Sequence, residues 1–395
     1  MSELSYLEKL LDGVEVEWKT LEDISIKISS GGTPKTGVSE FYDGDIPWLR
    51  TQEVNFCDIW DTEVKITESG VKNSSAKWIP KNCVIVAMYG ATVGKIGINK
   101  IPMTTNQACA NIQLNEEVAH YRYVFHFLCS QYTYIKSLGT GSQTNINAQI
   151  VKNIKIPIPC PDNPEKSLAI QSEIVRILDT FSALTAELTA ELNMRKKQYN
   201  YYRDQLLSFK EGEVEWKTLG EVAVIGTGNH DTQDAIEHGK YIFYARGREP
   251  LKLNVFDFDE TAIITAGDGA GVGKVFHYAK GKYALHQRAY RIVPNAFMNP
   301  RFVYHYITAY FFTYIQKASV SSSVTSLRRP MFLKFPIPVP PSEEQARIVE
   351  ILDKFDTLTN SITEGLPREI ELRQKQYEYY RDLLFSFPKP ETVSN

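Results

Sequence analysis

The feature that most constrains the fold of this chain is an internal repeat. The heptapeptide EVEWKTL stands at 15–21 and again at 213–219. Three more segments recur in the same order: IKIPIP at 154–159 and LKFPIP at 333–338, IVRILD at 174–179 and IVEILD at 348–353, KQYNYYRD at 197–204 and KQYEYYRD at 375–382. Such repetition predicts two copies of one structural unit. Each half has an opening strand, a long variable body, a proline-rich closing segment and a long helix.

The two bodies between these matching segments are divergent, and only fragments of them correspond. The hexapeptide GATVGK at 90–95 resembles GAGVGK at 269–274, and Asn106-Gln107 aligns with His286-Gln287. A nearly identical frame that holds two divergent bodies indicates one task performed on two different targets.

Length and composition limit the class of protein. The 395 residues are 43% hydrophobic, which is enough for two cores and an additional element. A formal net charge of −3 argues weakly against coating nucleic acid by bulk charge, but it allows local basic patches. The five cysteines are scattered, with no pair spaced for zinc, and no run of about 18 apolar residues occurs. We therefore expect a soluble cytoplasmic protein without a metal site.

Two long helices are predicted from apolar residues that recur at steps of three and four. The first, at about 165–209, follows Pro164 and has its stripe at Ile170, Ile174, Ile177, Phe181, Leu184, Leu188 and Leu192. The second, with Ser342 as its predicted cap, has its stripe at Ile348, Ile351, Phe355, Leu358, Ile362, Leu366 and Ile370. Gly365 and Pro367 should kink or break the second helix.

A narrow apolar stripe that continues over many turns is typical of a coiled coil. We expect two long antiparallel coiled-coil helices that act as a spacer, each spanning ~65 Å at about 1.5 Å per residue; two ordinary core helices are the alternative. A tandem TAEL lies in the first helix, at 185–188 and 189–192. One more copy would lengthen the helix by about 6 Å and rotate it by roughly 40° beyond a full turn.

The domain boundaries follow from these elements. We expect a first domain at 1–161, a central helix at 162–210, a second domain at 211–340, a C-terminal helix at 341–387 and a tail at 388–395. Each body mixes β-rich runs (84–86, 110–114, 241–244, 262–265) with one helix (121–138 and 300–317). The predicted fold class is α/β, with a twisted, mostly antiparallel sheet in each domain and a pseudo-twofold internal repeat.

Polar and basic side chains gather in loops at matching places of the two bodies. Asn and Gln can hydrogen-bond adenine, Arg can hydrogen-bond guanine, and hydroxyl groups and backbone amides suit phosphate. The DNA-binding candidates of the first body are Thr33, Lys35, Arg50, Gln52, Lys72, Lys95, Asn106, Gln107, Ser142, Gln143 and Asn145. Those of the second body are Arg246, Arg248, Lys274, His286, Gln287, Arg288, Ser323, Thr325, Arg328 and Arg329. For each one alone, a solvated surface side chain is the alternative.

Motifs of common catalytic sites are missing. The hexapeptides at 90–95 and 269–274 have one residue too few for a phosphate-binding loop and no Ser or Thr after the lysine, so they predict a tight turn between strands. No NPPY-like segment of an amino-methyltransferase occurs, and Pro161-Asp162 with Glu165-Lys166 is explained better as a helix start than as a nuclease motif. The sequence therefore gives no support for a catalytic, cofactor-binding or metal-binding site.

The whole chain resembles the specificity subunits of type I restriction–modification systems. The resemblance rests on GGTP at 31–34 followed by IPW at 46–48, on the two PIP segments that precede the helices, and on the repeated helix ends. The two TAEL copies and the YYRD ends are similar to the type IC branch. The second body departs from this pattern, with GTGNH at 226–230 and YAR at 244–246.

The resemblance implies a division of labour between subunits. Each body would be a target recognition domain for one half of a bipartite DNA site, with 31–34 and 46–48 near the recognition loops of the first domain. The helices would hold the two bodies apart and bind two methyltransferase subunits, and added restriction subunits would give the ATP-driven nuclease. S-adenosylmethionine, ATP and magnesium would belong to those partners, and the number of TAEL copies would set the gap between half-sites.

Two other classes of protein remain open at this point. A scaffold with two protein-binding modules on a coiled coil would fit the acidic net charge, although the divergence of the bodies disfavours it. A methyltransferase or nuclease fused in one chain is disfavoured by the missing catalytic loops. The isolated chain's methyl-transfer activity would separate the second class from the others.

Overall fold

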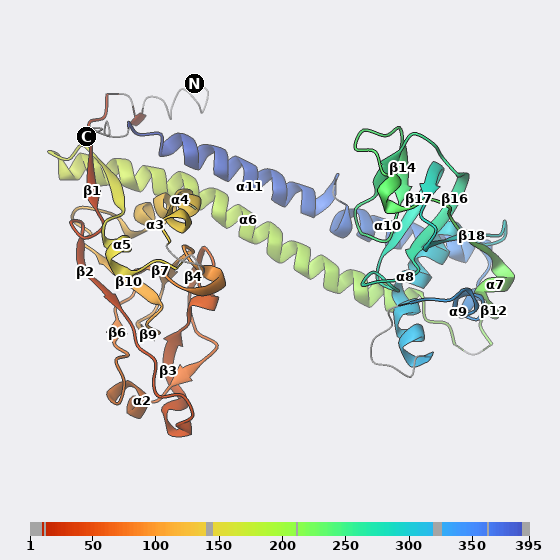
Figure 1. The fold of residues 1–395 in the computed structure, drawn as a ribbon, viewed down its shortest axis with the longest axis horizontal. Helices are drawn as coiled ribbons and strands as arrows, with labels where there is room; N and C mark the ends of the chain where they lie inside the picture. The colour runs from red at the N-terminus through yellow and green to blue at the C-terminus, as the bar shows by residue number, and fades with distance from the viewer. Residues whose placement is uncertain are drawn as a thin grey trace. The chain divides into compact units, whose positions relative to one another are not determined.

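The computed structural model describes residues 10–11, 13–139, 145–210, 212–318, 326–361 and 363–388. The chain divides into two compact units (Figure 1). The first unit comprises Met1–Glu187 and Ile370–Asn395, and the second comprises Leu188–Glu369. Each half of the sequence repeat contributes to both units. The first long helix continues past Glu187 into the second unit, and the C-terminal helix returns to the first.

The opening and closing segments of each body pair with each other. In the first unit, β1 (Val16–Thr20) is antiparallel to β11 (Lys155–Pro159). In the second, β12 (Glu215–Thr218) is antiparallel to β19 (Pro336–Val339). Proline cannot donate a ladder hydrogen bond, which confines these closing strands to two-stranded sheets. The repeated segments therefore close each body at the point where its helix begins.

The first unit contains two larger sheets. Their strands are β2 (Ser25–Ser30), β3 (Tyr42–Leu49), β4 (Cys57–Ile59), β5 (Lys65–Ile66), β6 (Trp78–Ile79), β7 (Val84–Ala87), β8 (Ile96–Asn99), β9 (Met103–Thr105) and β10 (Cys109–Leu114). The orders are β2-β10-β7-β8-β4 and β5-β3-β9-β6. The sheet with β3 and β9 lies at the end of the unit remote from the long helix, as does α2 (Glu68–Lys72) (Figure 1).

The second unit has one six-stranded sheet, in the order β13-β18-β16-β17-β14-β15. Its strands are β13 (Ala223–Thr227), β14 (Tyr241–Tyr244), β15 (Leu251–Leu253), β16 (Phe258–Ala266), β17 (Phe276–Leu285) and β18 (Ala289–Pro294). The only parallel strand pairs in the described part of the chain are β4 with β8, β3 with β9, and β14 with β17. The expectation of mostly antiparallel sheets is therefore confirmed.

The helix that covers each sheet differs between the units. Residues 121–138, predicted as one helix, form α3 (Tyr121–Ser130) and α4 (Tyr132–Ser137), so the prediction of a single helix was wrong. The break falls at Gln131, whose ψ of 10° departs from helical geometry. In the second unit α8 (Pro300–Ala318) is continuous. Shorter helices α5 (Ala148–Lys152), α7 (Leu219–Val222) and α9 (Arg329–Leu333) flank the closing strands.

The long helices lie where they were predicted, except for the cap of the second. The first is α6 (Pro164–Leu206), capped by Asn163, whose Oδ1 accepts from the Lys166 backbone N–H at 3.0 Å. The C-terminal stretch is broken, as predicted, into α10 (Ser342–Asn360) and α11 (Gly365–Leu384). Ser342 is the first residue of α10 rather than its cap, so that prediction was wrong; the cap position is Pro341, which has no side-chain acceptor.

Aromatic contacts pair α6 with the C-terminal helices in each unit. Within the first unit, Phe181 of α6 stacks on Tyr380 of α11 with ring centroids 5.1 Å apart. Within the second, Tyr202 of α6 stacks on Phe355 of α10 at 5.7 Å. The residue number of the contact increases along α6, from 181 to 202, while that of its partner decreases, from 380 to 355. The pairing is therefore antiparallel, as expected.

A polar cluster fixes the first body to α6. Asp179 accepts hydrogen bonds from Arg122 at 2.6 and 2.7 Å and faces His126 Nε2 at 2.7 Å. Arg122 also pairs with Asp58 of β4, and His126 Nδ1 faces the Tyr377 hydroxyl of α11 at 3.0 Å. Burial opposes the ionisation of Asp179, but the hydrogen bonds from His126 and Arg122 outweigh it and lower its pKa. We call Arg122, His126 and Asp179 the first Arg–His–Asp cluster.

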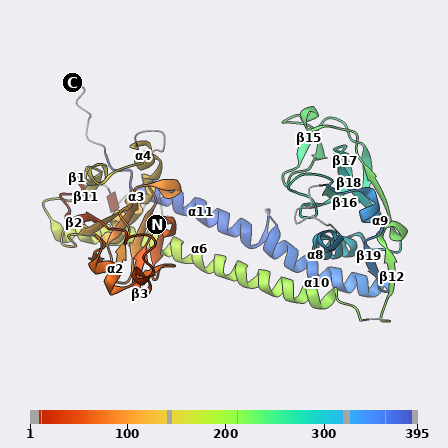
Figure 2. The same ribbon diagram turned by 60° about the horizontal axis from the view of Figure 1, so that its bottom comes forward.

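The second unit repeats this cluster on α8 and α10, which pack against each other (Figure 2). Asp353 accepts from Arg301 at 2.6 and 2.9 Å and faces His305 Nε2 at 2.7 Å. Here Arg301 turns its other contact to Asp356, one helical turn further along α10. Arg301, His305 and Asp353 form the second Arg–His–Asp cluster.

Among the helices of the described residues, none combines the length and the apolar character that a membrane span requires.

Candidate nucleic-acid interface

The glycine-rich hexapeptides form the same turn in both units. In the first unit the turn joins β7 to β8 and has positive φ at Gly90 (81°) and Gly94 (79°). In the second it joins β16 to β17, with φ of 82° at Gly269 and 66° at Gly273. Positive φ favours glycine at these four positions, because a Cβ would strain the backbone there. The prediction of a tight turn between strands is confirmed.

A glycine near the start of each body lies against a strand end. A Cβ on Gly31 would clash with the Thr105 carbonyl at the end of β9, and a Cβ on Gly228 would clash with the Leu285 carbonyl at the end of β17. The next backbone N–H bonds the same carbonyl in each unit, from Gly32 at 2.9 Å and from Asn229 at 3.2 Å. The glycines of GGTP and GTGNH therefore have equivalent positions, although the sequences did not align.

A further backbone hydrogen bond connects the end of β9 or β17 to the end of the neighbouring parallel strand, β3 or β14. The Asn106 N–H donates to the Leu49 carbonyl at 2.9 Å, and the His286 N–H donates to the Tyr244 carbonyl at 3.0 Å. The residues that follow Leu49 and Tyr244 are thereby placed at the same point of the two bodies. By this match YAR at 244–246 corresponds to residues 49–51, which directly follow IPW at 46–48. The Trp48 indole also donates to the Gly32 carbonyl at 2.9 Å.

One backbone hydrogen bond at the end of each polar segment, 139–147 and 321–329, completes the set of matched contacts. We call this set of matched backbone contacts the shared frame. The Ile146 N–H donates to the Met88 carbonyl at 3.0 Å, and the Leu327 N–H donates to the Gly267 carbonyl at 2.7 Å. Each bond holds Ile146 or Leu327 against the backbone two residues before the first glycine of the turn. Ser142, Gln143, Ser323 and Thr325 lie outside the described residues. Asn145 is described, and its Oδ1 accepts from the Gly90 N–H at 3.4 Å.

In the first unit, several candidate side chains bond to one another. The Thr33 hydroxyl bonds Gln107, and Lys95 donates to Asn55 at 2.8 Å. The Arg50 guanidinium is 2.8 Å from the Glu63 carboxylate and 3.6 Å from Glu53. These two carboxylates occupy Arg50, which weakens its case as a base-contacting residue.

Other candidates of the first unit stand apart from this frame or at its edge. Lys72 ends α2 and forms only an exposed pair with Glu68 at 3.5 Å in the described structure. Lys35 and Gln52 are exposed, and Gln52 lies next to Thr51, whose carbonyl accepts from Thr92 of the glycine turn at 2.8 Å. The frame therefore brings together the described candidates of this unit other than Lys35 and Lys72.

In the second unit, the candidates Gln287 and His286 at the end of β17 have partners within the protein. Gln287 donates to Asp231 at 2.9 Å, at the place where Thr33 bonds Gln107 in the first unit. His286 is 1% exposed, and its Nδ1 accepts from the Arg288 backbone N–H at 2.9 Å. Burial, reinforced by the positive charge of Arg246, lowers the pKa of His286. The imidazole is therefore predominantly neutral at pH 7, with Nε2 as its donor.

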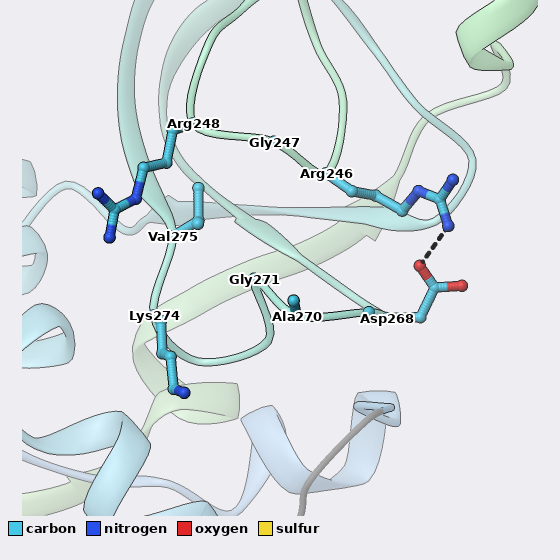
Figure 3. A pocket seen from close by; sticks show the side chains of 9 residues that line it. Arg246, Gly247, Arg248, Asp268, Ala270, Gly271, Lys274 and Val275 are labelled. Carbon is cyan, nitrogen blue, oxygen red and sulfur yellow. Dashed lines mark hydrogen bonds and ion pairs between the residues drawn. The ribbon is translucent and has the colours of Figure 1, made fainter. Parts of the chain in front are cut away.

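Arginine and lysine side chains line a cavity of about 560 Å³ beside the glycine turn of the second unit (Figure 3). Arg246 and Asp268 face each other on one side of the cavity, while Arg248 and Lys274 lie on the other (Figure 3). Arg288 also bonds Asp268, at 3.1 Å. Arg328 and Arg329 are exposed just after Leu327, which the frame holds at this turn. Asp268 was missed by the sequence analysis, which sought only residues able to contact DNA directly.

Both parts of the sequence repeat match one family. Residues 13–195 and 211–372 match the model of the type I restriction modification DNA specificity domain. This chain belongs to the type I restriction–modification specificity family. It is 42% identical to the type I restriction enzyme EcoR124I/EcoR124II specificity subunit of Escherichia coli, over 100% of both chains. It is 40% identical to the EcoprrI specificity subunit of the same organism, over 92% of this chain and 93% of that one.

Solved structures support the fold. The S subunit of a type I restriction–modification system from M. genitalium has a TM-score of 0.65 at 16% identity, covering 96% of this chain and 98% of that one.

Among the described residues, no three His, Cys, Asp or Glu side chains are grouped so that they could hold a metal ion. The described site is thus a set of loop side chains on a repeated backbone frame.

Proposed function

We propose that this chain recognises a bipartite DNA target for a type I restriction–modification complex, with one body for each half-site. The observation that carries the proposal is the shared frame, which places different side chains at equivalent positions of the two units. Base edges are distinguished by the hydrogen-bonding groups that meet them. One frame with two sets of such groups suits two different half-sites.

The other subunits of the complex would carry the chemistry. We propose that two methyltransferase subunits bind along the helices, that restriction subunits join them, and that S-adenosylmethionine, ATP and magnesium are bound by those partners. The chain itself would be non-catalytic and would act in the cytoplasm. Its similarity to type I specificity subunits, over 100% and 93% of their lengths, supports its place in such a complex.

The TAEL repeat of α6 would set the gap between half-sites. Inserting a third copy after Leu192 adds about 6 Å of helix, or one to two base pairs at roughly 3.4 Å per pair. The spacer of the methylated motif should lengthen by that amount while both half-sites stay unchanged. A change in either half-site would show that the helix does not act as a simple spacer.

The decisive experiment is methylation mapping. The chain is co-expressed with a type I methyltransferase subunit in a host that lacks DNA methylation, and co-purification first checks that the two proteins form a complex. Sequencing should then reveal modified adenine in both halves of one split motif, and omission of this chain should abolish it. If the complex forms but directs no methylation, the chain is a scaffold with two protein-binding modules. Methyl transfer by the isolated chain would show that it is itself an enzyme.

A further inference from the structure

Three positions of the shared frame carry contrasting side chains in the two units. Matched backbone hydrogen bonds identify them. They are the second residue after the end of β3 or β14, the residue before the glycine turn, and the residue whose carbonyl accepts from the Met88 or Gly267 N–H. The first unit has Thr51, Tyr89 and Ala108 at these positions, and the second has Arg246, Asp268 and Arg288. The second set is charged, and the first is not.

The charged set is organised around one carboxylate. Arg246 Nη1 donates to Asp268 Oδ1 at 2.9 Å, and Arg288 Nη1 donates to Asp268 Oδ2 at 3.1 Å. The arginine side chains are 42% and 63% exposed, while Asp268 is 25% exposed. Desolvation opposes the ionisation of Asp268, but the two arginine hydrogen bonds outweigh it and lower its pKa. Asp268 therefore stays charged and holds two exposed guanidinium groups in fixed directions.

Backbone contacts fix Asp268 itself. The preceding residue, Gly267, donates its N–H to the Arg288 carbonyl at 2.8 Å and accepts from the Leu327 N–H at 2.7 Å. Asp268 also forms an isolated antiparallel bridge with Ser326. A carboxylate whose backbone is bonded to two neighbouring segments is suited to orient side chains, because its own position varies little.

The chemistry of this group favours a base pair over a phosphate. Each arginine uses one nitrogen on Asp268, and its fork has further N–H donors for the O6 and N7 acceptors of guanine. The Asp268 carboxylate would repel a phosphate, whereas it can accept from the N4 amino group of cytosine. Arg248 and Lys274 lie on the other side of the cavity (Figure 3) and carry the charge that suits the backbone.

We propose that Arg246 and Arg288 are specificity-determining residues for a G·C pair in the second half-site, and that Asp268 is the positioning residue that orients them. This inference rests on the proposed function. It adds the chemical identity of one recognised base pair and a role for a residue of the same charge as DNA. An ion pair with only a structural role, and contacts to phosphate only, are the outcomes that would contradict it.

The test measures methylation rates of the assembled methyltransferase complex on oligonucleotides that carry the mapped motif. Each base pair of the second half-site is replaced in turn, and discrimination is the ratio of rates on matched and replaced duplexes. Arg246→Lys and Arg288→Lys keep the charge but lose the bidentate fork, and Asp268→Asn removes the orienting charge. Lys274→Ala is the phosphate-contact control, and Glu237→Gln changes an exposed acidic residue away from the group.

The arginine variants should lose about tenfold in discrimination at one G·C pair, since a bidentate base contact contributes about 1–3 kcal/mol. Asp268→Asn should lose discrimination at the same pair. The first half-site should be unaffected, and Lys274→Ala should slow all substrates alike. A second half-site without G·C, or arginine variants with lower rates but unchanged discrimination, would overturn the proposal. Failure of the unaltered complex to methylate any motif would instead overturn the proposed function.

Discussion

The Arg–His–Asp clusters of the two units have the same three residues but different surroundings. In the first unit, Arg122 connects Asp179 of α6 to Asp58 of β4, and His126 also meets Tyr377 of α11. In the second, Arg301 pairs with two carboxylates of α10 and lies over the Tyr278 ring of β17, 4.9 Å from its centroid. The Nδ1 atom of the buried His305 has no hydrogen-bond partner in the described structure. The hydrogen bonds and ion pairs of the first cluster join four elements, and those of the second join two. We infer that the first is the stronger attachment of a body to its helix.

Replacing the cluster aspartates should give the largest effect and test this difference. Asp179→Ala leaves Arg122 and the fully buried His126 without their shared acceptor, and loss of one partner of a buried ion pair costs about 3–5 kcal/mol. We expect a loss near the lower end, about 3 kcal/mol, because Asp179 is 32% exposed. Each arginine keeps one carboxylate after the change, Asp58 or Asp356. Asp353→Ala should cost about half as much, because Asp353 is 37% exposed and solvent screens its ion pairs more.

Hydrogen exchange followed by mass spectrometry resolves the two units and checks this prediction. Protection should fall mainly in α3 for Asp179→Ala and mainly in α8 for Asp353→Ala. Glu187→Gln, at an exposed position of α6, is the control for changing an acidic residue of this helix. Equal losses in both units would contradict the inference that the first cluster is the stronger attachment.

The two tryptophans of the identical opening segments provide a second test. The Trp18 indole donates to the Pro388 carbonyl at 2.8 Å and packs edge-on against Phe127. Trp216 is 45% exposed and has an edge contact with Tyr306. Trp18→Ala should therefore destabilise the first unit by about 2 kcal/mol, and Trp216→Ala should destabilise the second by about 1 kcal/mol, less than for fully buried aromatic residues. Urea unfolding monitored by circular dichroism measures the difference, and a larger loss for Trp216→Ala would contradict it.

These examples also show what could be predicted from sequence. The repeated segments gave the two bodies, the long helices and the glycine turn, because periodicity and glycine depend on local backbone geometry. The equivalence of Gly31 with Gly228 was not predictable, since it depends on a carbonyl of a distant strand. Asp268 was not predicted as a site residue, because its role depends on two arginines that are 22 and 20 residues away along the chain.

Tyr89 sharpens the comparison of the two recognition surfaces. It occupies the position of Asp268 and is 39% exposed. An exposed ring there can contact base edges by apolar packing, as with the thymine methyl group. Tyr89→Ala should lower discrimination within the first half-site about fivefold and leave the second half-site unchanged, as measured by methylation rates on replaced duplexes. Trp60→Ala removes another exposed aromatic ring of the same unit as the control. Loss in the second half-site would refute the assignment of one body to each half.

A pH effect on the first cluster should be the smallest. Burial lowers the pKa of His126 despite the opposing effect of Asp179, and Arg122, Asp58 and Tyr377 complete its charged and titratable surroundings. Because the folded-state pKa lies below the unfolded value of about 6.5, the contribution to stability is fully present above that pH. It is lost as the pH falls below about 6.5, when the unfolded chain takes up a proton that the folded chain does not.

From pH 7.5 to 5.5, the first unit should therefore lose at most about 1.4 kcal/mol of unfolding free energy through His126. His126→Gln should show a shallower pH dependence in urea unfolding than the unaltered chain, although it is less stable at pH 7.5. His238→Gln, at an exposed site of the second unit, should leave the slope of the first unit unchanged. If His126→Gln keeps the full slope, the acid sensitivity comes from another group, of which His120, whose pKa burial also lowers, is the next to test.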